Sequence, residues 1–225
     1  MTIPYSLLAK WYDQLYSDDF YNQYAIFIQS QAQQYKISKI DLLDVACGTG
    51  RLLSKLVPYS VSSVGIDSSA GMLAEARKKL PQTKFHLQNM TAIRISGMYN
   101  VITCTFDSLN YVLNIDDVQE YFRNIKKLLK EQGIFIFDFN TIHKKPLGLI
   151  SKGKITYKDR THGTFWDINI HTPSGQEFHH EKLYTLEEIK HALEVNGMHI
   201  KKIYSNFSTQ ITKEDKHPRI IVVAQ

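Results

Sequence analysis

The sequence predicts an α/β fold in which helices cover both faces of a mostly parallel sheet. From residue 40 onward, short apolar runs alternate with segments of helical periodicity, as in repeated strand–helix–strand units. The run at residues 42–45 leads into a glycine-rich turn, and an amphipathic segment follows at once. A buried strand that feeds a loop and a helix in this way marks the ligand-binding edge of an α/β sheet.

Two helices are predicted in residues 5–36, before the alternation begins. In the second, aromatic and aliphatic side chains recur at helical spacing after an N-cap at Ser17-Asp18. Strand-like runs follow at residues 41–46, 61–66, 83–88, 99–106 and 134–139. Helical patterns lie between them at residues 51–57, 69–79 and 115–130, and Gly133 predicts the end of the last helix.

Residues 141–184 interrupt this rhythm. Alternating apolar and polar positions, separated by glycines and by Pro173-Ser174-Gly175, predict a small antiparallel β insertion. The α/β pattern resumes with a capping box at residues 185–188 and a helix that ends at Gly197, and strands are predicted at residues 198–206 and 219–224. We therefore predict one domain over residues 1–225, made of an N-terminal helical lid (1–36), a core (37–140), the insertion (141–184) and the end of the core (185–225).

Composition is that of an ordinary globular domain. The 225 residues are 43% hydrophobic and 22% charged, and the basic residues behind the net charge of +5 are scattered, which favours a solvated surface over an anionic partner. Cys47 and Cys104 lie in strand-like contexts, so we expect reduced thiols and a cytoplasmic location. We expect no signal peptide and no membrane span, because neither pattern is present, and no metal, because His, Cys and acidic residues lack ligand spacing.

The glycine turn excludes two common ligands. A dinucleotide-binding loop needs a third glycine where this chain has Leu53, and a phosphate-binding loop needs a lysine and a hydroxyl residue where it has Arg51-Leu52. What remains is the pattern D-x-A-x-G-x-G, which begins at Asp44. It offers a close-approach surface with a carboxylate beside it and suits a cationic ligand.

This segment resembles the first motif of the class I S-adenosylmethionine-dependent methyltransferases, and further landmarks follow in the family's order. The resemblance implies that Asp67 accepts both ribose hydroxyls and that Met72 packs against adenine. Asn89 stands where the family usually has an aspartate, and its amide can accept from the adenine amino group and donate to a ring nitrogen. The implied cofactor-binding residues are Tyr12, Asp44, Ala46, Cys47, Gly48, Gly50, Asp67, Ser68, Met72, Asn89, Met90 and Phe106.

The chain looks most similar to small bacterial methyltransferases that include sugar N,N-dimethyltransferases. Residues 11–16 resemble their N-terminal Y-D-x-x-Y helix, which covers the cofactor, and the β insertion matches their substrate-covering sheet. The resemblance implies a Rossmann-like sheet of seven strands in the order 3-2-1-4-5-7-6, with one antiparallel strand. It also implies S-adenosyl-L-methionine as cofactor, with S-adenosyl-L-homocysteine as product. The expected substrate-binding residues are Tyr5, Tyr16, Asp107, Asn110 and Tyr111.

The reaction expected from this resemblance is in-line transfer of a methyl group to a small-molecule acceptor. No residue is identified by sequence as a general base, although Tyr12 and His179 are candidates, so we favour an amine nitrogen. Residues 106–109 lack the prolines of amino-directed DNA methyltransferases, and we expect neither a nucleic-acid nor a membrane partner, and a monomer or homodimer. The alternatives are a macromolecular methyltransferase, acting on protein or RNA, and a non-catalytic module that binds S-adenosylmethionine.

Overall fold

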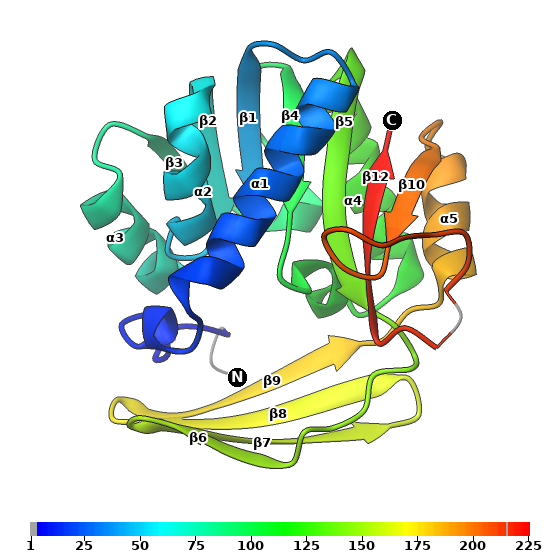
Figure 1. The fold of residues 1–225 in the computed structure, drawn as a ribbon. Helices are drawn as coiled ribbons and strands as arrows, with labels where there is room; N and C mark the ends of the chain where they lie inside the picture. The colour runs from blue at the N-terminus through cyan, green and yellow to red at the C-terminus, as the bar shows by residue number, and fades with distance from the viewer. Residues whose placement is uncertain (1–3, 215) are drawn as a thin grey trace.

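The computed structural model describes residues 4–214 and 216–225, which contain two separate β-sheets (Figure 1). The larger sheet has eight strands in the order β11-β10-β12-β5-β4-β1-β2-β3. Its strands are β1 (Ile40–Val45), β2 (Ser60–Asp67), β3 (Lys84–Leu87), β4 (Tyr99–Cys104), β5 (Leu129–Asn140), β10 (Ile200–Tyr204), β11 (Gln210–Ile211) and β12 (Arg219–Ala224). The run from β3 to β5 is parallel, and β12 is antiparallel to both of its neighbours.

The expected α/β fold and the order 3-2-1-4-5-7-6 are confirmed, but the expected number of strands is wrong by one. The additional strand, β11, pairs antiparallel with β10 through two residues at the edge of the sheet. A segment this short carries too few alternating positions to be recognised from its pattern.

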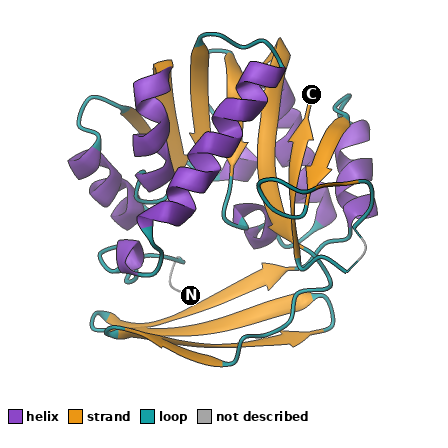
Figure 2. Ribbon diagram, in the orientation of Figure 1, coloured by secondary structure: helices purple, strands orange, loops and turns teal. Residues whose placement is uncertain are grey.

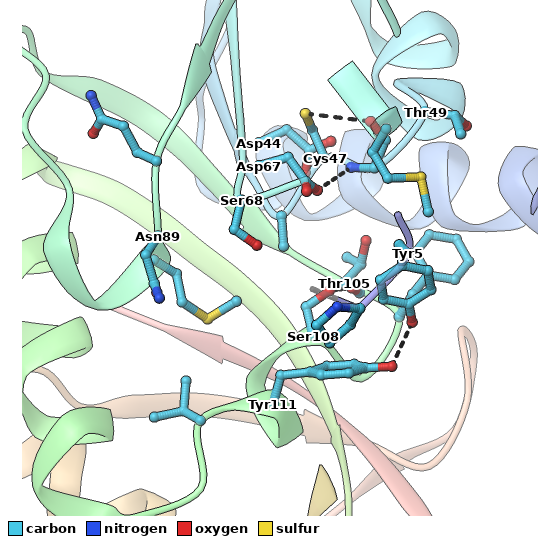
Figure 3. Close-up of a pocket in the computed structure, with 18 of the residues that line it drawn as sticks. Tyr5, Asp44, Cys47, Thr49, Asp67, Ser68, Asn89, Thr105, Ser108 and Tyr111 are labelled. Carbon is cyan, nitrogen blue, oxygen red and sulfur yellow. Dashed lines mark hydrogen bonds between the residues drawn. The ribbon is translucent and has the colours of Figure 1, made fainter. Parts of the chain in front are cut away.

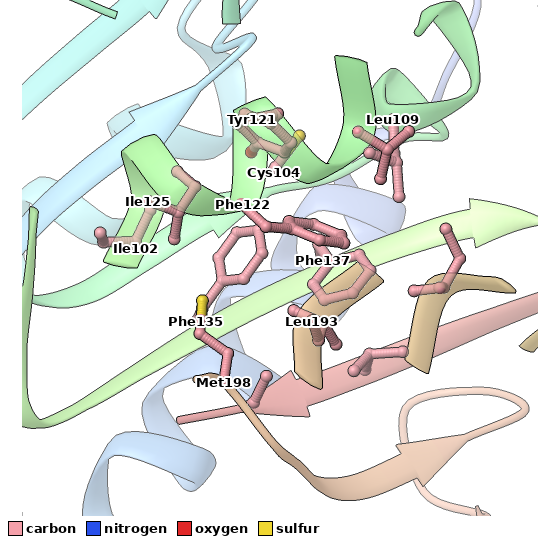
Figure 4. Close-up of a cluster of buried hydrophobic side chains, with 14 of the residues drawn as sticks. Ile102, Cys104, Leu109, Tyr121, Phe122, Ile125, Phe135, Phe137, Leu193 and Met198 are labelled. Atoms are coloured by element: carbon pink, nitrogen blue, oxygen red, sulfur yellow. The ribbon is translucent and has the colours of Figure 1, made fainter. Parts of the chain in front are cut away.

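Helices cover both faces of the large sheet (Figure 2). Helices α1 (Asp18–Gln34), α2 (Arg51–Leu56) and α3 (Ala70–Lys79) lie on one face, and α4 (Ile115–Leu128) and α5 (Leu186–Glu194) lie on the other. The last strand of the parallel set shows how one sequence serves both layers. Phe135 and Phe137 of β5 pack beside Phe122 of α4, whereas Ile134 and Ile136 join the cluster under α1 (Figure 4). Because successive side chains of a strand point to opposite faces, β5 contributes side chains to the hydrophobic clusters on both faces of the sheet.

Three local predictions need comment. The first of the two N-terminal helices is wrong, because only a short 3₁₀ turn forms there, at Tyr12–Gln14. Gly133 does not end a helix: α4 stops at Leu128, and Gly133 lies inside β5, where a Cβ would approach the Asn100 carbonyl within 3.1 Å. The capping box is confirmed, with Thr185 and Glu188 each bonding the other's backbone N–H at the start of α5.

The second sheet is the antiparallel insertion. Its strands β6 (Leu149–Lys152), β7 (Ile155–His162), β8 (Phe165–Thr172) and β9 (Gly175–Lys182) pair in chain order. In Figure 1 it lies below the carboxyl ends of the parallel strands. Its apolar face includes Trp166, Ile168 and Ile170, which cluster with Leu8 and Leu15 of the N-terminal segment. The division of the chain into one domain with these parts stays a prediction. Within the described residues, no helix is long and apolar enough to cross a membrane.

Candidate active site

A cavity of about 600 Å³ lies at the carboxyl ends of β1, β2 and β4, within the size range of small-molecule pockets (Figure 3). Its wall has two chemically different parts. The carboxylate half is lined by residues at the ends of β1 and β2 and in the loops after β1, β2 and β3, within the segments 44–52, 67–72 and 88–91. The tyrosine half consists of Tyr5, Tyr12 and Tyr21 from the N-terminal region, and of Phe106, Ser108 and Tyr111 from the loop after β4.

The structure brings together the residues expected to bind the cofactor, with one exception. Those that line the cavity are Tyr12, Asp44, Ala46, Cys47, Gly48, Asp67, Ser68, Met72, Asn89, Met90 and Phe106. Gly50 does not line it. Its backbone has φ of +71°, and a Cβ there would lie 3.1 Å from the Cβ of Ala76. Gly50 therefore allows α2 to begin close against α3, which is a packing role.

Two buried carboxylates dominate the carboxylate half. Asp44 is the next-to-last residue of β1, is 2% exposed, and accepts a hydrogen bond of 2.7 Å from the Thr103 hydroxyl. Asp67 ends β2 and accepts the backbone N–H groups of Gly48 and Ser69, each at 2.8 Å. Burial raises the pKa of both groups; the pKa of Asp44 reaches about 7, with the charge of Asp67 adding to the rise and the Thr103 bond opposing it. A carboxylate can accept more donors than these, so both can bind a ligand.

The far end of the carboxylate half is formed by the loop after β3. The side-chain amide oxygen of Asn89, Oδ1, accepts from the backbone N–H and the hydroxyl of Thr91, at 3.0 and 3.1 Å, and so caps a short 3₁₀ turn at Met90–Ala92. These two bonds use the oxygen that was expected to accept from the adenine amino group. The amide nitrogen Nδ2 remains as a donor to a ligand. Asp117 of α4 lines the same cavity and adds a carboxylate that the sequence did not indicate.

The N-terminal segment is fastened to the glycine loop by charge. The carboxylate of Asp13 accepts a 2.6 Å bond from the Thr49 hydroxyl and pairs with Lys79 at 2.6 Å. Arg51 donates to the carbonyls of Asp13 and Tyr16, at 2.7 and 2.8 Å. These bonds hold the turn that contains Tyr12 across the mouth of the glycine loop.

The loop after β4 is held by one buried carboxylate, Asp138 of β5. Its two oxygens accept the backbone N–H groups of Phe106 and Asp107, at 2.8 and 2.7 Å, and the hydroxyl of Tyr24 at 2.5 Å. Phe106 and Asp107 both have positive φ, at +61° and +53°, a conformation that costs free energy in residues other than glycine. The carboxylate of Asp138 compensates this strain and fixes the loop that presents Ser108 and Tyr111.

Of the expected substrate-binding residues, Tyr5 and Tyr111 line the cavity, whereas Tyr16, Asp107 and Asn110 do not. Tyr16 stacks on Phe20 and is 41% exposed. Asp107 is engaged by Arg219 at 2.8 Å. The structure therefore places these three side chains outside the cavity, and a role in substrate binding stays a prediction for each of them.

Asn110 is held by partners that lie far from it in the sequence. It is fully buried, and its amide nitrogen donates to the carbonyls of Asn140 and Lys182, at 2.9 and 2.6 Å. Its amide oxygen accepts from the Asn140 N–H at 2.8 Å. Asn110 thus joins the core to the end of the insertion.

The two candidates for a base differ in position. Tyr12 lines the cavity. His179 is 1% exposed on β9 and does not line it, although its Nδ1 lies 2.7 Å from the hydroxyl of Tyr111, which does.

Sequence reasoning missed several lining residues. In the sequence, Arg51 indicates only that the glycine loop is not a phosphate loop. Tyr21 lies on the apolar face of α1, where its sequence position does not distinguish it from any other core aromatic residue. The lining residues not expected from sequence are Pro4, Tyr21, Thr49, Arg51, Leu52, Gln88, Thr91, Thr105, Ser108, Val112, Leu113, Asn114 and Asp117. Across residues 4–214 and 216–225, no three His, Cys, Asp or Glu side chains are grouped as metal ligands; that the enzyme needs no metal stays a prediction.

Comparison with known proteins agrees with this geometry. Residues 42–133 match the family model described as a methyltransferase domain. A protein of Geobacillus sp. (strain WCH70), named only provisionally as a methyltransferase, is 27% identical over 99% of this chain and all of its own length. The dTDP-3-amino-3,6-dideoxy-alpha-D-glucopyranose N,N-dimethyltransferase of Streptomyces fradiae is 30% identical over 41% of this chain and 36% of its own.

Among solved structures, an S-adenosylmethionine-dependent methyltransferase from Clostridium acetobutylicum ATCC 824 superposes with a TM-score of 0.84 and 26% identity, covering 98% of each chain. The match extends over the core and the insertion together. With the glycine loop and the paired carboxylates, these similarities support a class I S-adenosylmethionine-dependent methyltransferase that resembles the sugar N,N-dimethyltransferase type.

Proposed function

We propose that this methyltransferase acts on an amine nitrogen of a small molecule. The observation that carries the proposal is the tyrosine half, where the aromatic residues Tyr5, Tyr12, Tyr21, Phe106 and Tyr111 line one cavity. Aromatic faces attract sulfonium and ammonium groups by about 0.5–2 kcal/mol each. Such a wall suits both the cationic cofactor and an acceptor that carries a positive charge.

The residues present fit S-adenosylmethionine in the carboxylate half. We propose that Asp67 binds the ribose hydroxyls, that Met72 and Met90 lie against adenine, and that Asn89 donates to a ring nitrogen. Asp44 is a buried carboxylate facing the same cavity, and a cationic part of the cofactor would offset the cost of ionising it. When bound, the cofactor supplies an activated methyl group.

Similar proteins support the amine. The relative from Streptomyces fradiae is named for dimethylation of an amino sugar, as is one from Streptomyces venezuelae that is 28% identical over 43% of this chain. A neutral amine already carries the lone pair that attacks a methyl group. The chain then contributes proximity and orientation, worth up to about 7–11 kcal/mol of the barrier. A nucleotide-linked amino sugar is one acceptor of this class. A cytoplasmic location, the lack of a nucleic-acid partner and a monomeric or dimeric state stay predictions.

The proposal is tested by methyl transfer from radiolabelled S-adenosylmethionine into separate pools of small amines (including nucleotide-linked amino sugars), alcohols and carboxylic acids. We expect label in the amine pool, and no label when Asp67→Ala replaces the wild type. Transfer confined to the alcohol or acid pool would overturn the amine. Label in none of the pools, but in total protein or RNA, would favour a macromolecular acceptor.

A further inference from the structure

Four side chains form a continuous hydrogen-bonded chain that ends at the cavity. Glu177 Oε2 lies 3.0 Å from His179 Nε2, and His179 Nδ1 lies 2.7 Å from the hydroxyl of Tyr111. That hydroxyl lies 2.7 Å from the hydroxyl of Tyr5, and the bond between the two tyrosines is drawn in Figure 3. Both tyrosines line the cavity, whereas Glu177 and His179 are each 1% exposed on the face of β9 that meets the core.

The direction of donation follows from the Glu177 end. Burial raises the pKa of this carboxyl, but the hydrogen bonds from His179 and from the Leu7 backbone outweigh it, so the pKa is lowered overall. An ionised carboxylate can only accept, and the Nε2 of a neutral His179 must therefore carry the proton. Its Nδ1 is then an acceptor, and Tyr111 donates to it. Because Tyr111 has given its only proton, Tyr5 donates to Tyr111 and keeps free acceptor lone pairs at the cavity.

We infer that Tyr5, Tyr111, His179 and Glu177 relay a proton away from the methyl acceptor, an inference that rests on the proposed amine methylation. The N–H bond of the acceptor ammonium breaks as its proton moves to the Tyr5 oxygen. The Tyr5 proton moves to the Tyr111 oxygen, and the Tyr111 proton to His179 Nδ1. The amine retains the electron pair with which it attacks, and the imidazolium lies beside the Glu177 carboxylate. The proton returns along the same chain when the cavity opens to solvent.

Two properties of the tyrosines suit this role. Burial, with smaller contributions from nearby carboxylates, raises the pKa of Tyr5 and of Tyr111 well above the ordinary value, so both stay protonated and pass a proton on rather than hold a charge. Tyr5 also has φ of +66°, and its N–H donates to Glu177 at 3.0 Å. The Glu177 carboxylate thus orients both Tyr5, which receives the proton first, and His179, which receives it last.

The charged and titratable groups around the relay come from three elements. They are Glu177 and Glu181 on β9, Tyr5 in the N-terminal segment, and Asp107 and Tyr111 in the loop after β4. Among these, Glu177 alone accepts from the imidazole, and Tyr111 alone contacts Nδ1.

Glu177 has a structural role as well, so it is a poor place to test the relay. Its carboxylate also accepts the Ser6 hydroxyl and the N–H groups of Leu7 and Leu8, and a variant there would loosen the N-terminal segment. Among the contacts that the structure describes, the imidazole of His179 hydrogen-bonds only to Glu177 and Tyr111, whereas the Tyr111 hydroxyl also interacts with the Glu181 carboxyl. His179 acts through Tyr111 and is a positioning residue.

The test uses the full chain labelled with ¹⁵N-histidine and saturated with S-adenosylhomocysteine. Long-range ¹H–¹⁵N spectra report which nitrogen of His179 carries the proton, and loss of the signals in His179→Gln assigns them. We expect a neutral imidazole protonated at Nε2. The ¹⁵N signals of His179 should shift in Tyr111→Phe and stay fixed in the control Tyr59→Phe, at a residue that is 59% exposed. Protonation at Nδ1 in the neutral form would overturn the relay whatever the acceptor is.

The second measurement is the rate of labelled methyl transfer into the amine pool between about pH 6 and pH 9. We expect the wild-type rate to rise with pH. In His179→Gln, which can keep the hydrogen bonds, we expect an altered pH profile and a loss of at least about tenfold of the rate at neutral pH. Unchanged binding of S-adenosylhomocysteine would show that the variant is folded. An unaltered pH profile in His179→Gln would overturn the relay and leave the proposed function intact. No transfer by the wild type would instead overturn the proposed function.

Discussion

The carboxylate half and the tyrosine half of the cavity are built in opposite ways. In the carboxylate half, the hydrogen bond between Gly48 and Asp67 spans 19 residues of sequence. It forms because Gly48 follows β1 and Asp67 ends the neighbouring parallel strand β2. In the tyrosine half, the bonds that fix the wall span 172 residues between Tyr5 and Glu177 and 68 between Tyr111 and His179. The proposed cofactor half is therefore built from loops that are near one another in sequence, whereas the proposed acceptor wall depends on contacts between distant segments of the chain.

The largest expected effect is at Asp138, which fixes the loop of the tyrosine half. Asp138→Ala leaves the N–H groups of Phe106 and Asp107 and the Tyr24 hydroxyl without their acceptor, and we expect a loss of about 3–5 kcal/mol in the free energy of unfolding. Urea unfolding measures it. Asp41→Ala removes an ion pair that is part exposed, with Lys130, and should cost less than about 1 kcal/mol. Equal losses in the two variants would show that Asp138 does not hold the loop.

The next effect belongs to the carboxylate half. Asp67→Ala removes the proposed acceptor of two ribose hydroxyls, and hydrogen bonds to a charged group contribute about 1.5–3 kcal/mol each. We expect S-adenosylhomocysteine to bind at about micromolar concentration in the wild type and at least about 100-fold more weakly in the variant. Isothermal titration calorimetry measures both. Asp19→Ala, at an exposed position of α1, is the matched control. A change under threefold at Asp67 would remove it from the cofactor site.

Asp44 should make cofactor binding depend on pH. Its pKa is raised by burial to about 7, so the carboxyl is protonated below that pH and must lose its proton before it can pair with a cation. We expect affinity for S-adenosylmethionine to rise about fivefold from pH 6 to pH 7 and about tenfold from pH 6 to pH 8, and to level off above about pH 8. Asp44→Asn should flatten the curve at the weaker limit. A wild-type curve that is flat across this range would contradict a cationic partner for Asp44.

The smallest expected effect separates the ring of Tyr12 from its hydroxyl. A ring over a sulfonium contributes about 0.5–2 kcal/mol, so Tyr12→Ala should weaken S-adenosylmethionine more than the uncharged product S-adenosylhomocysteine. Tyr12→Phe keeps the ring and should leave both affinities within about twofold. Competition binding of the two ligands gives the ratio. If Tyr12→Phe bound S-adenosylmethionine as weakly as Tyr12→Ala, the hydroxyl and not the ring would be the binding group.

The same contrast explains which parts of the molecule could be predicted from sequence. The parallel core and the carboxylate half follow from local signals, namely apolar runs, strand-end acids and the glycines at positions 48 and 50. Gly50 shows the limit of such a signal, because spacing identifies the loop but not which glycine faces the ligand. Asn89 shows a second limit, because its side-chain amide oxygen accepts a hydrogen bond from Thr91 and not from a ligand.

The tyrosine half could be predicted only in outline. Tyr5 and Tyr111 were expected at one site, and their hydroxyls do lie together. The sequence does not show that Asp107 and Asn110 bond elsewhere, because their partners Arg219 and Lys182 lie 112 and 72 residues further along the chain. On β9, Glu177, His179 and Glu181 are spaced by two residues and share the buried face. This spacing was visible in the sequence, yet a polar inner face departs from the usual apolar-in pattern of a half-buried strand.

A crystal structure with S-adenosylhomocysteine tests the central claim most directly, namely that one cavity combines a cofactor half and an acceptor half. We expect the ribose hydroxyls on Asp67, adenine beside Asn89 and Met90, and the sulfur facing the wall that contains Tyr5 and Tyr111. The hydroxyls of these two tyrosines should remain open to the space beyond the sulfur. Ligand bound elsewhere, or bound with its sulfur turned away from the tyrosine half, would contradict the account.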